Sequence, residues 1–185
     1  MKKKLREEAL TKRNNIPAEA REKKSESAAV HILKSEAFRK AEKVFTFVNM
    51  GAEIETREII KQAWKEGKIV AVPKTEKRRV MYFIPVTSFD DLQKGRFGVM
   101  EPTGTIEDAI VPEADDLFLV PGALFDKKKH RIGYGGGYYD TYFEKYRGYR
   151  KVGLAFSEQI TEMPLPAEAF DIPLDDIVTE NGWEE

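Results

Sequence analysis

Short apolar runs alternate with helix-like segments through the middle of the 185-residue chain, and this alternation limits the possible folds most strongly. The runs at 43–48, 68–73 and 115–122 read KVFTFV, KIVAVP and DDLFLVPG. They are short and rich in β-branched or aromatic residues, which is typical of strands, and the third is apolar enough for a central strand. Strands that alternate with helices favour an α/β layered fold with a largely parallel sheet.

The rest of the sequence predicts further helices, strands and one long loop. We predict that Pro17 begins the second helix, that Thr56 caps the third, and that Gly67 ends the third. The stretch 85–104 has scattered Gly and Pro and no sustained period, so we expect a long loop with one helical turn. No linker divides the chain, so one domain, 1–185, is expected. The remaining predicted elements are helices at 2–15, 17–38 and 138–146 and strands at 78–86, 151–156 and 175–180.

Composition narrows the class of protein. Hydrophobic residues make up 41%, which is typical of a globular chain, and 31 basic against 32 acidic residues give a net charge of −1. This balance weighs against bulk binding to nucleic acid or anionic lipid. There is no cysteine, the basic N-terminus precedes no apolar run, and no stretch approaches about 20 apolar residues. We therefore expect a soluble, cytoplasmic protein without nucleic-acid or membrane partners.

The stretch 131–140 reads RIGYGGGYYD and could bind an anion. It fits neither the Walker A pattern nor the dinucleotide fingerprint, since Tyr138 stands where the third glycine of the fingerprint would be. Consecutive glycines nevertheless let a backbone approach a ligand, and a helix that starts near Tyr138 would add its dipole. Arg131 offers donors suited to phosphate, and Asp140 an oxygen ligand suited to Mg²⁺. The alternative is a strand-to-helix turn with surface tyrosines.

The longer segment VPGALFDKKKHRIGYGGGYYDTYF resembles the signature of 5-formyltetrahydrofolate cyclo-ligases, also called 5,10-methenyltetrahydrofolate synthetases. Three other segments, KKKLR, NMGAEIETREII and GLAFSEQI followed by FDIPLDDIVTE, resemble the same family in the same order. The resemblance covers nearly the whole chain and is weakest at 85–102. The matching signature residues are Val120, Pro121, Gly122, Phe125, Asp126, Arg131, Ile132, Gly133, Gly135, Gly137, Tyr138, Tyr139 and Asp140.

The resemblance implies a single three-layer α/β/α domain with a mixed sheet, and an ATP- and Mg²⁺-dependent enzyme. Such an enzyme converts 5-formyltetrahydrofolate to 5,10-methenyltetrahydrofolate and releases ADP and phosphate. The nucleophiles belong to the substrate, so the protein mainly positions reactants and stabilises charge. We also expect a monomer. Two alternatives remain: a sugar-phosphate or acyl-CoA binding enzyme of similar fold, and a non-catalytic module that binds nucleic acid or protein.

The resemblance also implies roles for particular residues. Arg131 and Tyr138 are the expected catalytic residues, and Asp140 and Asp171 the expected Mg²⁺ ligands, with Asp175 or Asp176 as alternatives to Asp171. Some relatives carry Lys where this chain has Gly136. The expected ATP-binding residues are Lys2, Lys3, Lys4, Leu5, Arg6, Arg131, Ile132, Gly133, Tyr134, Gly135, Gly136, Gly137, Tyr138 and Tyr139. The expected folate-binding residues are Arg6, Met50, Glu55, Tyr134, Gly135, Gly136, Gly137 and Tyr138.

Several of these residues have ordinary structural interpretations. Lys2 and Arg6 are spaced i, i+4 and share one helix face, which without the resemblance indicates a solvated basic terminus. Glu55 could simply stabilise the dipole of the next helix.

Three further residues could have binding or structural roles. Lys74, just after the run at 68–73, could contact phosphate or a glutamate tail. The two histidines, His31 and His130, are expected to have packing or loop roles, because two isolated histidines do not make a metal site.

Overall fold

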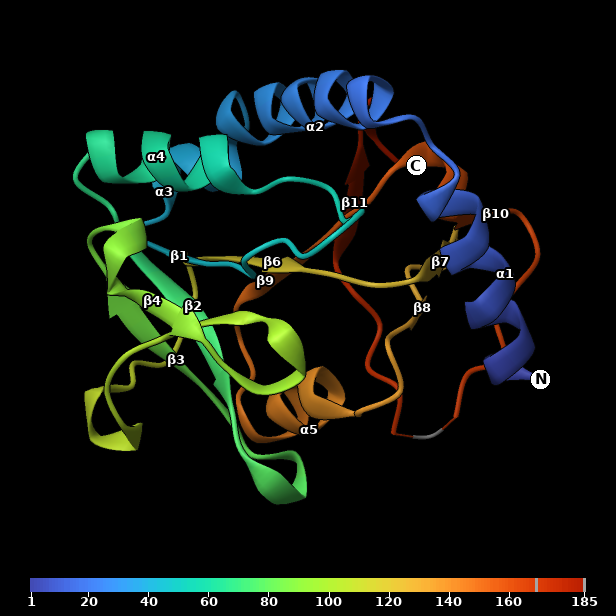
Figure 1. Cartoon of the computed structure of the whole chain (residues 1–185). Coiled ribbons are helices and arrows are strands. Elements are labelled where there is room, and N and C mark those ends of the chain that lie inside the picture. The colour runs from blue at the N-terminus through green and yellow to red at the C-terminus, as the bar shows by residue number, and fades with distance from the viewer. Residues whose placement is uncertain (169, 185) are drawn as a thin grey trace.

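A seven-stranded mixed sheet forms the centre of the protein (Figure 1). The structure is a computed structural model and describes residues 1–168 and 170–184. Five inner strands are parallel, and the two outermost strands are antiparallel to their neighbours, as expected for a mostly parallel mixed sheet. Across the sheet the strands are β12 (Gly182–Trp183), β11 (Asp176–Thr179), β9 (Arg150–Leu154), β6 (Leu117–Val120), β1 (Lys43–Phe45), β2 (Ile69–Thr75) and β3 (Met81–Val86).

Alternating side chains of the inner strands build one apolar core on each face of the sheet. Val44 and Leu119 belong to the core under the helices at the top of Figure 1, whereas Phe45 and Phe118 belong to the core on the opposite face. This is the period of two that a strand buried on both sides requires. The helices on the first face are α2 (Ala18–Leu33), α3 (Glu36–Lys40) and α4 (Arg57–Lys65), and α5 (Tyr138–Lys145) covers the second.

The helix predicted over 17–38 is two helices. Its break lies at Ser35, which has extended backbone angles and accepts a hydrogen bond from the backbone N–H of Phe38, so it caps α3. Thr56 is the N-cap residue of α4, as predicted, but its side chain makes no capping hydrogen bond, because its hydroxyl donates to the carbonyl of Phe47 at 2.8 Å. Gly67, with φ of 74°, follows the end of α4 as predicted. No described helix is long and apolar enough to cross a membrane.

The loop predicted over 85–104 contains a hairpin that the sequence did not reveal. Strands β4 (Leu92–Lys94) and β5 (Met100–Pro102) pair antiparallel, and the N–H of Gly95 donates to the carbonyl of Val99 at 2.8 Å to close them. The turn needs left-handed backbone at Phe97, with φ of 56°, and at Gly98. Short 3₁₀ turns at η2 (Phe89–Asp91), η3 (Arg96–Gly98) and η4 (Ile106–Asp108) accompany the hairpin.

Helix α1 (Lys2–Asn14) lies beside a second, three-stranded sheet rather than over the central one (Figure 1). Leu5 and Ala9 pack against Leu124 and Ile132 of that sheet. This contact places the N-terminal helix next to the glycine-rich stretch, although the two are more than a hundred residues apart in sequence. The small sheet consists of β10 (Ile160–Thr161), β7 (Leu124–Asp126) and β8 (Arg131–Ile132).

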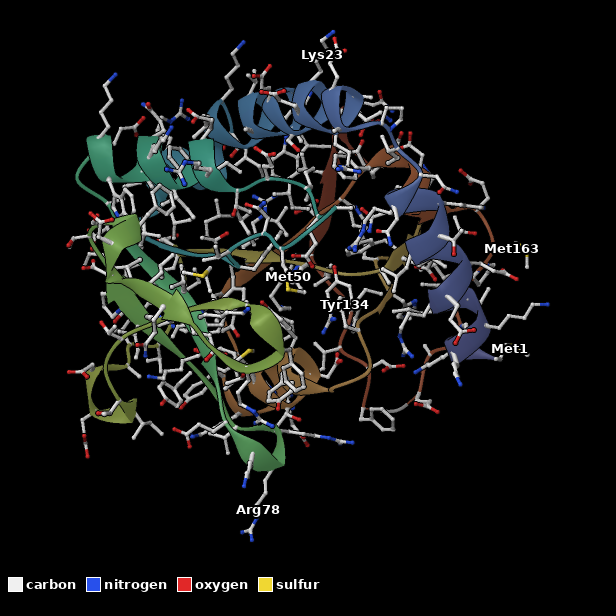
Figure 2. All side chains as sticks on the ribbon, viewed as in Figure 1. Met1, Lys23, Met50, Arg78, Tyr134 and Met163 are labelled. Atoms are coloured by element: carbon white, nitrogen blue, oxygen red, sulfur yellow. The ribbon has the colours of Figure 1, made fainter. Side chains whose placement is uncertain are left out.

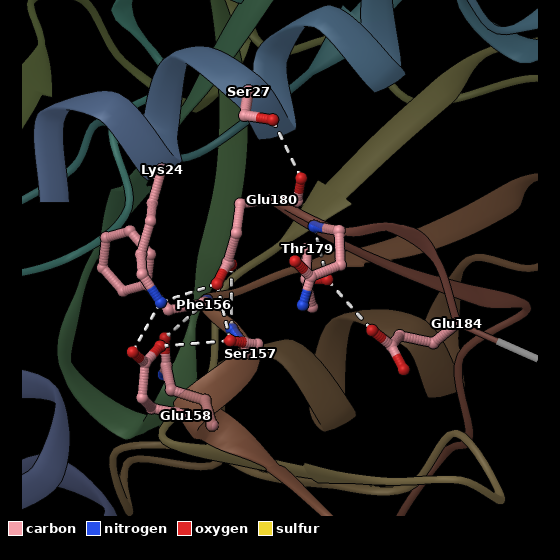
Figure 3. A network of polar contacts seen from close by, with 10 residues as sticks. Lys24, Ser27, Phe156, Ser157, Glu158, Thr179, Glu180 and Glu184 are labelled. Carbon is pink, nitrogen blue, oxygen red and sulfur yellow. Dashed lines mark hydrogen bonds and ion pairs between the residues drawn. The ribbon is translucent and has the colours of Figure 1, made fainter. Parts of the chain in front are cut away.

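Lys24 of α2 belongs to a polar network that ties this helix to the end of β11 (Figure 3). Its Nζ donates to Oε1 of Glu180 at 2.7 Å and also pairs with Glu158. The N–H of Ser157, which begins η5 (Ser157–Gln159), donates to the same Glu180 carboxylate at 2.9 Å. Burial disfavours the charged form of Glu180, but its hydrogen bonds with Lys24 and Ser157 outweigh this and lower its pKa.

The strand order identifies where a ligand is expected to bind. Numbered along the chain, the five parallel strands β1, β2, β6, β9 and β11 lie in the order 2-1-3-4-5. The order reverses between β1 and β6, so a crevice opens outside their carboxyl ends. The segments that follow these two strands therefore become the first candidates for a functional site.

Candidate active site

A cavity of about 980 Å³ lies at the carboxyl ends of β1 and β6, where the strand order reverses. Phe47 and Met50 after β1 and Pro121 after β6 line it, together with the glycine-rich stretch and α1. Figure 2 shows Met50 and Tyr134 near each other in the middle of the molecule. The volume is at the upper end of the roughly 300–1,000 Å³ of small-molecule sites, which gives room for a large ligand or two adjacent ones.

The structure brings most of the predicted site residues together in this cavity. Lys3 and Lys4 do not line it, since their side chains are exposed and pair with Glu7 and Glu8, and Leu5 is in the apolar contact under α1. The predicted residues that do line it are Lys2, Arg6, Met50, Arg131, Ile132, Gly133, Tyr134, Gly135, Gly136, Gly137, Tyr138, Tyr139, Asp140 and Asp171.

The glycine-rich loop needs its glycines at two positions in particular. Gly135 and Gly137 have φ of 99° and 70°, a region that other residues rarely adopt. Gly137 is the N-cap of α5, which begins at Tyr138 as predicted. The unpaired N–H groups of the first helical turn and the helix dipole therefore lie at the edge of the cavity, an arrangement that favours bound anions.

Two arginines hold the glycine-rich loop in place. The Nε of Arg6 donates to the carbonyl of Gly133 at 2.7 Å, which joins α1 to the loop. The Nη2 of Arg131 donates to Oδ2 of Asp140 at 3.1 Å, and its side chain is only 4% exposed. The Nε of Arg131 is buried and has no hydrogen-bond partner among residues 1–168 and 170–184. A buried donor without a partner is unusual in a folded protein, and it makes Arg131 a candidate for a ligand-binding role.

Tyr134 connects the loop to the segment that follows β1. Its hydroxyl accepts a hydrogen bond from Nη1 of Arg13 at 2.8 Å, and Arg13 in turn lies 3.9 Å from the carboxylate of Glu53. Burial and the nearby Glu53 carboxylate raise the pKa of Tyr134, so the hydroxyl stays protonated. Neither Arg13 nor Glu53 was predicted, because nothing local in the sequence distinguishes them from other charged residues of α1 and of the β1–α4 segment.

Of the two residues after β1 that were predicted to bind folate, one lines the cavity and the other does not. Met50 lines the cavity and is 44% exposed, whereas Glu55 is exposed and is not among the lining residues. The carboxylate that faces the cavity from this segment is Glu53, which accepts a hydrogen bond from the N–H of Met50 at 2.8 Å. The role of Glu55 stays a prediction.

The 85–104 segment also contributes to the cavity. Phe97 at the tip of the β4–β5 hairpin is 69% exposed and lines the opening, and Glu101 lines it with 5% exposure. Oε1 of Glu101 accepts a hydrogen bond from the hydroxyl of Thr75 at 2.7 Å. Sequence reasoning missed both residues, since the segment had no recognisable period.

The acidic residues predicted to bind Mg²⁺ both face the cavity. Oδ1 of Asp140 accepts from the N–H of Ile172 at 3.4 Å, which holds Asp140 beside the Asp171 segment. Asp171 forms an ion pair with Lys2. Burial disfavours the charged form of Lys2, but its hydrogen bonds to Asp171 and Glu168 outweigh this effect and raise the pKa of Lys2.

The alternative ligands Asp175 and Asp176 point elsewhere. They pair with Lys151 and Arg150, and neither lines the cavity. Within the part of the chain that the structure describes, no group of three or more acidic or histidine side chains could hold a metal ion. Two carboxylates nevertheless suit Mg²⁺, which usually keeps waters and takes further oxygens from a bound phosphate chain. His130, as expected, has a loop role, with its Nδ1 3.3 Å from Oδ2 of Asp126.

Comparison with known proteins gives a consistent result. The model of the 5-formyltetrahydrofolate cyclo-ligase family matches residues 1–180. The NMR structure of Aquifex aeolicus 5,10-methenyltetrahydrofolate synthetase is similar, with a TM-score of 0.84 and 35% identity over 99% of this chain and 91% of that one. The mouse 5-formyltetrahydrofolate cyclo-ligase is 30% identical over 96% of this chain and 93% of its own length. The Haemophilus influenzae protein of the same name is 29% identical, over 94% and 95%.

Proposed function

Because the chain belongs to the 5-formyltetrahydrofolate cyclo-ligase family, we propose that it converts 5-formyltetrahydrofolate to 5,10-methenyltetrahydrofolate and converts ATP to ADP and phosphate. The observation that carries this proposal is a single cavity that joins an anion-binding loop to an apolar opening. The loop and its arginines suit a triphosphate, and Met50, Phe97 and Tyr134 suit a planar ring. Both reactants can therefore lie in one space.

The chemistry explains why the site has no nucleophilic triad. The formyl group of the substrate is an amide and a poor electrophile, so its oxygen first takes the γ-phosphoryl group of ATP and ADP leaves. N10 of the folate then attacks the formyl carbon, the ring closes, and the C–O bond breaks to release phosphate. Both nucleophiles belong to the substrate, so the protein contributes position and charge stabilisation.

The nucleotide side of the proposal rests on the glycine-rich loop and α1. Arg131 stabilises charge on the transferred phosphoryl group, supported by its buried and unpartnered Nε. Lys2 and Arg6 share the face of α1 that lines the cavity and contact the phosphates. Tyr138 stands at the first position of α5, where backbone N–H groups and the helix dipole favour the same anion.

The folate side rests on the residues after β1 and on the loop tyrosines. Met50 packs against the ring, Arg6 reaches the substrate from α1, and Gly135 to Gly137 let the formyl group approach the phosphates. For Glu55 to accept hydrogen bonds from the pterin, its side chain would have to turn from the exterior toward the cavity.

Asp140 and Asp171 would hold Mg²⁺ when nucleotide binds. The metal would neutralise charge on the phosphate chain, which is its usual contribution to phosphoryl transfer. In its absence each carboxylate has a cationic partner, Arg131 for Asp140 and Lys2 for Asp171. These ion pairs hold the two acidic side chains in place at the edge of the cavity.

The direct test mixes the purified protein with ATP, Mg²⁺ and 5-formyltetrahydrofolate and follows methenyl-folate by its absorbance. The proposal requires product that depends on ATP and an equal amount of ADP. Absence of an ATP-dependent signal would contradict it and would favour a sugar-phosphate or acyl-CoA binding enzyme of similar fold.

We further propose that the protein acts as a monomeric single domain in the cytoplasm, without nucleic acid. The near-neutral charge of −1 supports the lack of nucleic-acid binding. Sedimentation equilibrium would test the oligomeric state, and a mass twice that of one chain would contradict it.

A further inference from the structure

The hairpin between β2 and β3 also reaches the glycine-rich loop, at the end of the loop that begins α5. Its turn, η1 (Lys77–Arg79), closes with a hydrogen bond from the N–H of Glu76 to the carbonyl of Val80 at 2.8 Å. The hydroxyl of Tyr138 donates to the carbonyl of Glu76 at 3.0 Å. The hairpin is therefore fastened to the first residue of α5, at the anion-binding end of that helix.

Arg79 of this turn lies against the loop. A side-chain carbon added at Gly137 would be 3.4 Å from Nε and 3.5 Å from Cζ of Arg79. Arg79 also lines the cavity, whereas Arg78 does not and points away from the molecule at the hairpin tip (Figure 2). The guanidinium of Arg79 thus covers the glycine that caps α5.

Three arginines approach three alternate glycines of the loop in the same manner. A side-chain carbon at Gly133 would be 2.7 Å from Nη1 of Arg131, and one at Gly135 would be 3.5 Å from Cζ of Arg6. Arg79 completes this series at Gly137. The loop consequently has a guanidinium beside it near its start, its middle and its end, from three separate elements of the fold.

The position of Arg79 is electrostatically costly unless an anion is present. Its guanidinium lies near the positive end of the α5 dipole, where cations are disfavoured. Among residues 1–168 and 170–184, no hydrogen bond or ion pair engages its side chain, whereas Arg131 has Asp140. Its left-handed backbone, with φ of 61°, belongs to the turn and is shared by Arg78, so the cost that points to a ligand is the electrostatic one. A cation held at such a cost indicates that it serves a ligand.

We infer that Arg79 is a phosphate-binding residue of the nucleotide site and donates to the triphosphate chain beside Gly137, the N-cap of α5. This inference rests on the proposed function and extends it to a residue outside the glycine-rich loop and α1. It also gives this chain a cation near Gly136, where some relatives have Lys. A carboxylate of the folate glutamate is the other anion that the same guanidinium could bind.

The test measures binding and turnover for the wild type, Arg79→Ala, Arg79→Lys and the control Arg78→Ala. Arg78 has the same φ of 61°, so its replacement has a matching backbone effect, but it does not line the cavity. Calorimetry with ATP, inorganic tripolyphosphate and adenosine separates phosphate contacts from the rest of the nucleotide. The KM for 5-formyltetrahydrofolate is measured on the same proteins.

We expect Arg79→Ala to weaken ATP and tripolyphosphate binding about tenfold, with adenosine binding and the folate KM unchanged. Arg79→Lys should recover part of the loss, and Arg78→Ala should stay within about twofold of the wild type. Equal ATP and tripolyphosphate affinities in Arg79→Ala and Arg78→Ala would overturn the inference. A raised folate KM with unchanged ATP binding would also overturn it, in favour of the glutamate carboxylate.

These outcomes are separate from those of the proposed function. ATP-dependent turnover by the wild type with no effect of Arg79→Ala on phosphate binding overturns the role of Arg79 alone. A wild type that forms no methenyl-folate overturns the proposed function, and the tripolyphosphate titration still decides whether Arg79 binds an anion.

Discussion

Arg131 and Asp140 form an ion pair across the two ends of the glycine-rich loop, with Nη2 of Arg131 3.1 Å from Oδ2 of Asp140. The pair brings the cation proposed to stabilise the phosphoryl group and a carboxylate proposed to bind Mg²⁺ into direct contact. The ten residues that begin and end with this pair therefore form a closed loop, and all ten line the cavity. The loop geometry and the proposed Mg²⁺ site therefore depend on the same contact.

Replacing Asp140 should impair both nucleotide binding and turnover. Asp140→Ala removes a proposed Mg²⁺ ligand and leaves the buried Arg131 without its carboxylate. We expect the KM for Mg·ATP to rise and kcat to fall about a hundredfold, with a smaller change in the folate KM. Initial rates over a matrix of Mg²⁺ and ATP concentrations measure this. An unchanged dependence on both would show that the metal assignment is wrong.

The second metal ligand can be tested by comparing neighbouring aspartates. Asp171 lines the cavity, while Asp175 pairs with Lys151 outside it. Asp171→Asn should raise the Mg²⁺ concentration needed for half-maximal rate about tenfold, and Asp175→Asn should leave it at the wild-type value. The reverse order of effects would assign the ligand to Asp175.

Tyr134 is expected to position the loop through its hydroxyl. Tyr134→Phe loses the 2.8 Å hydrogen bond from Arg13, which removes about 1 kcal/mol of interaction between the loop and α1, while the bond from Arg6 to Gly133 remains. The KM values for ATP and folate should both rise about fivefold, with kcat nearly unchanged. The control is Tyr146→Phe, because Tyr146 is outside the cavity and its hydroxyl has no hydrogen bond among the described residues. A fall in kcat alone would argue against a positioning role.

The network around Glu180 predicts how stability depends on pH. The pKa of Glu180 in the folded protein is below its ordinary value of 4.5, so its contribution is fully present above 4.5 and is lost as the pH falls through the folded pKa. Urea unfolding at successive pH values should show a shallower acid loss in Glu180→Gln than in the wild type. Glu26→Gln, an exposed change on α2, the helix that contains Lys24, should keep the wild-type slope. Parallel slopes in all three proteins would contradict this assignment.

The sequence predicted the main layers of the fold because their signals are local. The runs that became β1, β2 and β6 are apolar and short, and Gly67 and Tyr138 mark helix boundaries as expected. The three-residue strands of the β4–β5 hairpin escaped prediction because their pairing depends on a left-handed turn at Phe97, a residue that rarely adopts one. The division at Ser35 escaped because its capping hydrogen bond interrupts an otherwise continuous helical pattern.

The residues of the candidate site also divide into those that local sequence patterns could predict and those that they could not. The glycine-rich loop, with Arg131 and Asp140, is contiguous in the sequence and could be identified there. Arg79 and Arg13 could not, since each reaches the cavity only through the folded arrangement of the β2–β3 hairpin and α1. Long-range contacts of this kind leave no pattern in a single sequence.

The most direct measurement follows the formyl oxygen. 5-Formyltetrahydrofolate labelled with ¹⁸O in the formyl group is turned over with unlabelled ATP and Mg²⁺, and the released phosphate is analysed by mass spectrometry. Because the formyl oxygen takes the γ-phosphoryl group and leaves with it, each phosphate should contain one ¹⁸O atom. Phosphate without the label would contradict activation of the formyl oxygen by ATP at this site.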